Sequence, residues 1–214
     1  MKKMILLSVF ALGALTINAQ TAVIESGGFW DNWSMGIQGG ATMKTSGAAF
    51  FKSARPAFGL TIGKQWTPIL GTDIQGMGYV NTTNSSTIID ATDVSLIGRM
   101  NLMNLFGAYD GMPDAFEIET VTGLGWLHHY STGDGDTNDL SARVGLNFNF
   151  NFGNDAAWTF GIKPAMVFNL TGDFPTRKLG FNKKHSNVEI LFGLTYHFAD
   201  ADGNRHFAMV NAVD

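Results

Sequence analysis

The sequence predicts an all-β chain that forms a closed antiparallel transmembrane β-barrel of eight strands. From Trp33 onward, apolar and polar residues alternate with a period of two, the pattern of strands with two different faces. The alternating stretches are about a dozen residues long, whereas strands of globular proteins average ~5–6 residues and a tilted strand needs ~9–11 to cross a bilayer. Charged residues make up only 15% of the chain, and soluble domains usually carry ~25%.

The first 19 residues have the features of a secretory signal peptide. Lys2 and Lys3 give a positive start, residues 5–15 form an uncharged apolar run, and Ala19 precedes the expected cut. The run is too short to span a bilayer as a helix, which argues against the alternative of an uncleaved anchor. We therefore expect residues 1–19 to be a signal peptide and residues 20–32 to be an N-terminal periplasmic segment.

The barrel is expected to occupy residues 33–198. Its first five strands are predicted near 33–45, 54–66, 70–81, 92–104 and 115–130, where the alternation is weaker but legible. The sixth strand, near 139–153, has the clearest pattern, because no α-helix could separate its two faces. One face holds Leu140, Ala142, Val144, Leu146, Phe148, Phe150 and Phe152, and the other holds Ser141, Arg143, Gly145, Asn147, Asn149 and Asn151.

Two more strands, near 157–170 and 186–198, repeat this pattern and bring the total to an even number, as is usual for bacterial barrels. Pro164 cannot donate a ladder hydrogen bond, so we expect a local irregularity there. Short connections at 67–69 and 153–155 alternate with longer polar ones at 46–53, 82–91, 131–138 and 171–185, which should lie outside the cell. The connection at 105–114 is a long periplasmic one, and the tail 199–214 should be periplasmic.

The alternation assigns each side chain to lipid or to the lumen. Aromatic residues near the strand ends of the lipid face predict a girdle at the membrane interfaces, made by Trp33, Trp66, Trp126, Tyr130 and Trp158. An eight-stranded interior is just wide enough to be filled by side chains, so charges enclosed there must pair. A closed plug is favoured over an ion-selective pore. The predicted lumen charges are Arg55, Asp73, Asp93, Arg99, Glu117, Glu119, Arg143, Lys163 and Glu189.

Six short runs form a recognisable series of motifs, at 29–34, 63–65, 75–79, 93–96, 101–106 and 145–150. In this order they resemble the N-terminal β-barrel of OmpA-like outer-membrane proteins of Gram-negative gut and oral anaerobes, over roughly 29–198. The resemblance implies an abundant structural protein that ties the membrane to peptidoglycan, forms low-conductance pores and displays adhesive loops. The tie belongs to a separate C-terminal domain of that family, which we do not expect in these 214 residues.

The final strand resembles the terminal-strand signal that the barrel-assembly machinery reads. Gly193, Tyr196 and Phe198 match the signal, although Leu191 stands where a polar residue is usual. The same residues also suit an ordinary barrel strand with an aromatic girdle.

A catalytic site is suggested only by His128, His129 and Ser131, which resemble the site of lipid A deacylases. A serine nucleophile needs a base, and the base needs an orienting acid. The alternation points His129 and Ser131 into the lumen, away from acyl chains, and no dedicated acid is evident. We therefore interpret the segment as an interfacial pair of His and Tyr and expect no catalytic residues.

No metal or cofactor site is expected either. Asp134, Asp136 and Asn138 are spaced like the start of a calcium loop, as are Asp200, Asp202 and Asn204, but neither set has the downstream Gly and Glu of an EF-hand. Turns rich in Asp and Asn have the same composition. The chain has no cysteine, and its formal net charge of −4 argues against nucleic acid as a partner.

These observations predict a non-enzymatic, structural barrel in the cell outer membrane, which supports envelope integrity and presents adhesive loops. A narrow porin for small solutes is the first alternative, and a lipid A-modifying enzyme is the second. The expected partners are outer-membrane lipid and lipopolysaccharide, the barrel-assembly machinery, and host or cell-surface ligands of the loops. A soluble lipocalin-like barrel would have its apolar face inward and its charges outward.

Overall fold

The computed structural model describes residues 23–24, 28–45, 53–80, 88–107, 109–130, 135–171, 180 and 182–210. The expected signal peptide, 1–19, lies outside these residues, and so do large parts of the four long connections. Within the described part, no helix has the length and apolarity that crossing a membrane requires.

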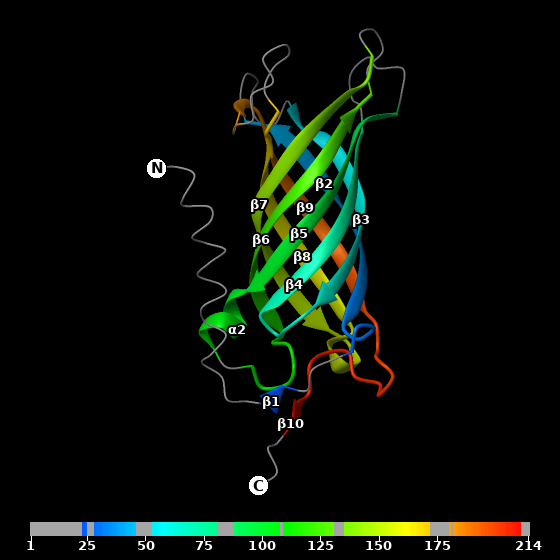
Figure 1. Cartoon of the computed structure of the whole chain (residues 1–214), viewed down its shortest axis with the longest axis vertical. Coiled ribbons are helices and arrows are strands. Elements are labelled where there is room, and N and C mark those ends of the chain that lie inside the picture. The colour runs from blue at the N-terminus through cyan, green and yellow to red at the C-terminus, as the bar shows by residue number, and fades with distance from the viewer. Residues whose placement is uncertain are drawn as a thin grey trace.

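Eight antiparallel strands close into one barrel in chain order, from β2 to β9 (Figure 1). Closure occurs where β9 pairs with β2, from Ser34 opposite His197 to Lys44 opposite Asn187. Because every strand has two neighbours, the barrel leaves no open sheet edge in the lipid. The strands are β2 (Trp33–Lys44), β3 (Arg55–Gln65), β4 (Leu70–Val80), β5 (Ile89–Asn101), β6 (Phe116–His129), β7 (Thr137–Phe152), β8 (Trp158–Asn169) and β9 (Asn182–His197).

The segments before β2 and after β9 lie at one end of the barrel, here called the terminal end, and the opposite end is called the loop end (Figure 1). The terminal end carries helix α2 (Leu102–Phe106), a short 3-10 turn (Asn154–Ala156), and a two-stranded ribbon of β1 (Val23–Ile24) and β10 (Met209–Val210). The ribbon joins the chain before the barrel to the chain after it.

The expected strand at 92–104 is displaced by three residues, and its end is wrong. β5 covers Ile89–Asn101, and residues 102–106 are helical. The side chain of Asn101 caps this helix by accepting hydrogen bonds from the backbone N–H groups of Met103 and Asn104. A local cap therefore ends the strand where the apolar pattern alone would continue it.

The irregularity predicted at Pro164 takes the form of an interrupted ladder. β7 and β8 pair as far as Gly145 opposite Ala165 and resume at Phe148 opposite Ile162 in the same register. On its other side, Pro164 pairs with Ile190 of β9 without a shift. The proline therefore removes local pairing with one neighbour and leaves the strand order intact.

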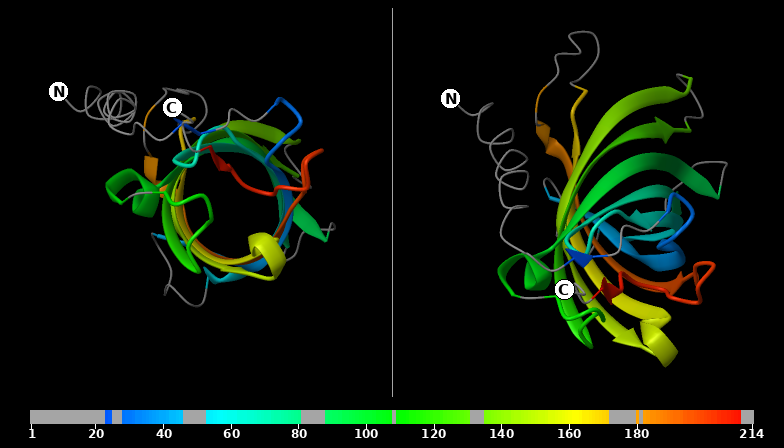
Figure 2. Two further views of the ribbon diagram at one scale, coloured as in Figure 1. Left: turned by 90° about the horizontal axis from the view of Figure 1, so that it is seen from below. Right: turned by 60° about the horizontal axis from the view of Figure 1, so that its bottom comes forward.

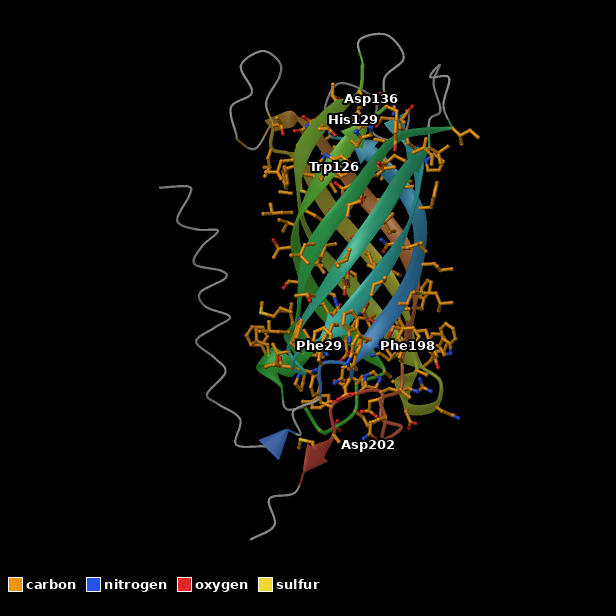
Figure 3. The ribbon with its side chains drawn as sticks, turned by 45° about the vertical axis from the view of Figure 1, so that its right-hand side comes forward. Phe29, Trp126, His129, Asp136, Phe198 and Asp202 are labelled. Atoms are coloured by element: carbon orange, nitrogen blue, oxygen red, sulfur yellow. The ribbon has the colours of Figure 1, made fainter. Side chains whose placement is uncertain are left out.

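The barrel is apolar outside and polar inside, which confirms the predicted transmembrane fold. Exposed side chains along the strands are mainly Ile, Leu, Phe, Val and Met, as at Ile37, Leu60, Leu96 and Phe192. Buried side chains at the alternate positions are largely polar or charged. Figure 3 shows outward side chains around the whole barrel, with Trp126 near the loop end and Phe29 and Phe198 at the terminal end.

Close packing between neighbouring strands depends on small residues at chosen positions, and Gly40 on β2, opposite Leu191 of β9, is the clearest test. A methyl group there would press on the carbonyl oxygen of Ile190 and lie 2.9 Å from the Cα of Leu191. Because both obstacles are backbone, we expect Gly40→Ala to lower the free energy of unfolding by about 1–3 kcal/mol.

The matched control is Gly76→Ala on β4, where an added methyl group meets nothing within 4 Å. Its effect should stay within about 0.5 kcal/mol. Urea unfolding of both variants in detergent micelles provides the measurement, and equal stabilities would contradict this account of the packing.

Candidate functional site

Arg99 organises the half of the lumen nearer the terminal end. Its Nε donates to Asp73 Oδ1 at 2.9 Å and its Nη1 donates to Glu119 Oε1 at 2.8 Å. The second carboxylate oxygen of Glu119 accepts hydrogen bonds from the amides of Asn147 and Asn149 at 3.1 and 2.9 Å. One guanidinium thus joins two carboxylates through two different N–H groups, and with the asparagines on Glu119 it links strands β4, β5, β6 and β7.

A second network fills the half nearer the loop end. Arg143 Nη1 lies 2.5 Å from Glu189 Oε2, and the hydroxyl of Tyr79 donates to the other oxygen of Glu189 at 2.7 Å. Beside it, Asp93 accepts hydrogen bonds from Ser141 and Ser95. Glu189 is 0% exposed and Asp93 is 1% exposed, so both carboxylates depend entirely on protein partners.

A layer of apolar side chains lies against this second network. The cluster consists of buried residues that point inward from several strands, so that half of the lumen is filled rather than open. Its members are Ala57, Met77, Tyr79, Ala91, Leu127 and Leu191.

Lys163 lies between the two networks. Its Nζ is 3.4 Å from Gln38 Oε1, and it lines small cavities on both sides. Gly161 and Gly193 leave room for its chain, because a methyl group at either glycine would lie within 3.0 to 3.2 Å of the lysine. Gly193 therefore also leaves space for the Lys163 side chain, whatever part it has in assembly.

The nine charged residues predicted for the lumen all occupy inward positions, and the structure brings most of them together in pairs. Glu117 accepts from the amides of Asn101 and Asn151 at 2.7 and 2.8 Å. Arg55 pairs with Asp90 at 2.8 Å near the loop end. Sequence reasoning missed Asp90 and Tyr79, and it placed the asparagines of β7 on the inward face without assigning them to the carboxylates that they contact.

A polar chamber of about 90 Å³ remains in the terminal half of the lumen. Its walls include Arg99, Glu117, Asn149 and His197, and its floor includes Phe207 from the C-terminal tail. Figure 2 shows this tail, in red, running across part of the barrel mouth. The sequence placed the tail at this end but gave no sign that it covers the lumen.

Specific contacts hold the tail in place. The hydroxyl of Tyr109 donates to the carbonyl of Phe207 at 2.9 Å, and both side chains are buried. Arg205 donates to the carbonyl of His197 at 2.6 Å and lies 5.2 Å from the ring centre of Tyr196. Burial also raises the pKa of the Tyr109 phenol, which keeps the hydroxyl protonated as a donor.

The five predicted girdle aromatics all lie on outward positions of the strands or just beyond them. An unforeseen contact joins two of them to a cation: Lys64 Nζ lies 5.6 Å from the ring centre of Trp33 and 5.1 Å from that of Trp66. Phe29 adds a third ring at 5.7 Å, and the carbonyl of Asp31 accepts a hydrogen bond from the ammonium at 2.7 Å. We call this arrangement the Lys64 cage. It fastens the segment before β2 to the outer wall.

The histidine pair at the loop end differs from the prediction in one respect. The prediction that no acid faces the histidines was wrong, because Asp139 lies 3.6 Å from His129 Nε2 and Asp136 lies 3.5 Å from His128 Nε2. Ser131, the nucleophile considered for this site, lies outside the described residues.

The two segments that were compared with a calcium loop, and not expected to bind metal, are described only in part. Asp134 lies outside the described residues, whereas Asp200 accepts hydrogen bonds from the backbone N–H groups of Asp202 and Asn204, as in an ordinary turn. Among the described residues, no group of three or more His, Asp or Glu side chains is arranged to hold a metal ion.

Gly193, Tyr196 and Phe198 keep the geometry of a terminal strand. The rings of Tyr196 and Phe198 meet edge to face at 5.4 Å on the outer wall. Recognition of these residues by an assembly machinery remains a prediction.

Comparisons with known proteins bear on the fold. No family model and no curated protein matches the chain. Among solved structures, neisserial surface protein A is similar with a TM-score of 0.54 and 11% identity, covering 78% of this chain and 98% of that one. The N-terminal β-barrel domain of Pseudomonas aeruginosa OprF gives 0.48 at 12% identity, with coverage of 78% and 97%. The likeness to neisserial surface protein A supports the fold expected from the OmpA-like resemblance, at the level of fold alone.

The Arg143–Glu189 pair should be costly to break from one side. Arg143→Met leaves the Glu189 carboxylate buried without its counter-ion, so we expect a loss of about 3–5 kcal/mol in the free energy of unfolding. The double variant with Glu189→Gln, which still accepts from Tyr79, should recover most of this loss.

The control is Arg55→Met, because the Arg55–Asp90 pair is more accessible, at 30% and 17% side-chain exposure. A partly exposed pair contributes about 0–1 kcal/mol. Chemical unfolding of the parent, Arg143→Met, the double variant and Arg55→Met gives the four free energies of unfolding to compare. A double variant no more stable than Arg143→Met alone would refute the pairing argument.

Attachment of the tail should depend on pH through His206. Its Nε2 lies 3.2 Å from the carbonyl oxygen of Ala156, and Arg205, Asp155 and His197 are its charged or titratable neighbours. Burial lowers the pKa of His206 below its usual 6.5. Protonation therefore favours the released tail: attachment is complete above about pH 6.5 and weakens as pH falls through the lowered pKa.

Hydrogen exchange of the amides in 199–210, corrected for intrinsic rates, measures this attachment. Protection should fall between pH 7 and pH 5 in the parent protein and change much less in His206→Gln. Equal protection in the parent at both pH values would contradict the prediction.

Proposed function

We propose that this chain is a structural, non-enzymatic barrel of the outer membrane of a Gram-negative bacterium. The observation that carries the proposal is the combination of an apolar outer wall with a charged interior that is closed by ion pairs and hydrogen bonds. An apolar wall of this kind is stable only in lipid, and export through the cell envelope fits the expected signal peptide. The barrel-assembly machinery is then a necessary partner.

Orientation follows from the ends of the barrel. Outer-membrane barrels have short turns and both termini on the periplasmic side, and longer loops outside the cell. The terminal end, with its tail across the lumen, would therefore face the periplasm. The loop end would present the long connections expected at 46–53, 82–91, 131–138 and 171–185 to the surroundings, where they would meet host or cell-surface ligands.

A structural role is favoured over a porin because both halves of the lumen are obstructed. The half toward the loop end is filled by the Arg143–Glu189 network and its apolar layer. The polar chamber in the other half is covered by the tail. A solute would have to displace paired charges and the tail in turn, and each displaced ion pair leaves uncompensated charge.

The lipid-modifying alternative has one supporting observation, the contact between His129 and Asp139, which resembles a base with its orienting acid. Ser131→Ala and Asp139→Asn test it through mass spectrometry of lipid A from expressing cells. Deacylated lipid A that appears with the parent chain and disappears with both variants would replace the structural role with an enzymatic one.

The main prediction concerns location and conductance. The chain should fractionate with the outer membrane, and the unheated protein should migrate differently from the heated one on a gel, because closed barrels resist detergent. In planar bilayers the parent should give at most rare, brief openings.

Removal of residues 199–214 provides the informative variant, because it uncovers the chamber but leaves the Arg143–Glu189 network. It should stay as closed as the parent. Steady, sizeable channels in the parent would favour the porin, and a chain that remained soluble after signal removal would refute the proposal as a whole.

A further inference from the structure

The outer wall carries an open hollow of about 620 Å³ over strands β4 to β7 toward the loop end. Its size falls in the range of ~300–1,000 Å³ that is usual for ligand pockets. Most of its lining is apolar, with Asn138 and Asp139 at the loop-end margin and the side chain of Ser95 turned into the lumen. The lining residues are Ile74, Val94, Ser95, Leu96, Leu124, Gly125, Trp126, Asn138, Asp139 and Leu140.

The strand register shows which side chains line the hollow. Val94, Trp126 and Leu140 are cross-strand partners and make one outward row. Leu96 and Leu124 form the next row toward the terminal end. Between the rows, Ser95 pairs with Gly125 and turns its side chain into the lumen, so the floor is bare backbone. The result is a groove with apolar walls that opens toward hydrocarbon.

A polar row follows immediately on the loop-end side. Thr92, His128 and Asn138 are cross-strand partners on the same outward face. The side-chain oxygen of Asn138 lies 3.0 Å from Trp126 Nε1, which donates to it, and 2.9 Å from His128 Nδ1. The ring of His128 lies 5.6 Å from that of Trp126 and 4.6 Å from that of Tyr130. Figure 3 shows Trp126 just below the loop-end rim, near His129 and Asp136.

The apolar groove, the neighbouring rings of Trp126, His128 and Tyr130, and the polar row therefore follow one another over a few residues of each strand. An amphiphile matches this order, with an acyl chain in the groove and a polar head against the row. The groups at the head position are ring faces, an amide, a hydroxyl and an imidazole, which suit sugar hydroxyls and amides. The carboxylates of Asp136 and Asp139 nearby would repel a phosphate.

We propose that this face binds a glycolipid of the outer leaflet, the lipid A part of lipopolysaccharide, through its acylated sugar rather than through its phosphates. The site rests on the proposed outer-membrane location, because only there does the loop end meet such a lipid. A second copy of the chain fits less well, since a two-fold contact needs a self-complementary surface and this one is concave.

The experiment uses the full mature chain, folded in a detergent with a polyether head, and native mass spectrometry to count bound lipid. The probes are monophosphoryl lipid A, its dephosphorylated form, and phosphatidylethanolamine. Leu124→Trp fills the groove, and Leu60→Trp on β3 is the matched control, because the two leucines are 58% and 62% exposed on the same outer wall. Asn138→Leu removes the amide of the polar row.

We expect one lipid A molecule to be retained by the parent and by Leu60→Trp, with and without phosphate, in preference to phosphatidylethanolamine. Leu124→Trp should weaken its retention at least tenfold. Asn138→Leu should weaken lipid A about tenfold, the equivalent of one lost hydrogen bond, and leave phosphatidylethanolamine unchanged.

Three outcomes would overturn the proposal: equal retention of both lipid classes, binding that needs the phosphate, or lipid-free dimers that Leu124→Trp abolishes. Gel mobility of the unheated protein is recorded first. A chain that fails to form a detergent-resistant barrel refutes the proposed function, whereas a stable barrel without selective lipid refutes only the glycolipid site.

Discussion

The narrow bore of an eight-stranded barrel is the constraint on which the rest of this structure depends. Its interior has room for side chains and little else, so each enclosed charge must find a partner within reach. Arg99 meets the constraint by pairing with carboxylates on the two adjacent strands, β4 and β6, and Arg143 by reaching past β8 to Glu189 on β9. Inward glycines provide the space: a methyl group at Gly71 would lie 2.9 Å from the guanidinium of Arg99. The enclosed charges therefore depend on the inward glycines for the space that their side chains occupy.

The sequence was most informative where one physical rule acts along a strand. A period of two places Arg143 inward and Val144 outward regardless of what surrounds them, so the fold class and the inward position of the charges could be read directly. It failed where a local hydrogen bond competes with the pattern, as at Asn101, which caps α2. It also failed for contacts between distant segments, because Asp139 facing His129 and Phe207 closing the chamber depend on how the strands and the tail meet.

The two ends of the lumen are closed in different ways. Toward the loop end, the closure is made by side chains of the barrel strands themselves, with the buried Arg143–Glu189 ion pair beside an apolar layer. Toward the terminal end, it consists of a separate segment held by a few contacts, including Tyr109 with Phe207 and Arg205 with His197. The first closure can open only by disrupting the barrel packing, whereas the second can detach while all eight strands stay paired.

The Lys64 cage and the polar row of Thr92, His128 and Asn138 lie near opposite ends of the outer wall. Both are fixed by the strand register, so the height of the apolar wall between them is fixed as well. A bilayer that is thicker or thinner than this height must deform around the barrel, at a modest cost for each ångström of mismatch. The barrel therefore has a fixed hydrophobic thickness, and lipids whose acyl length matches that height surround it at the lowest cost.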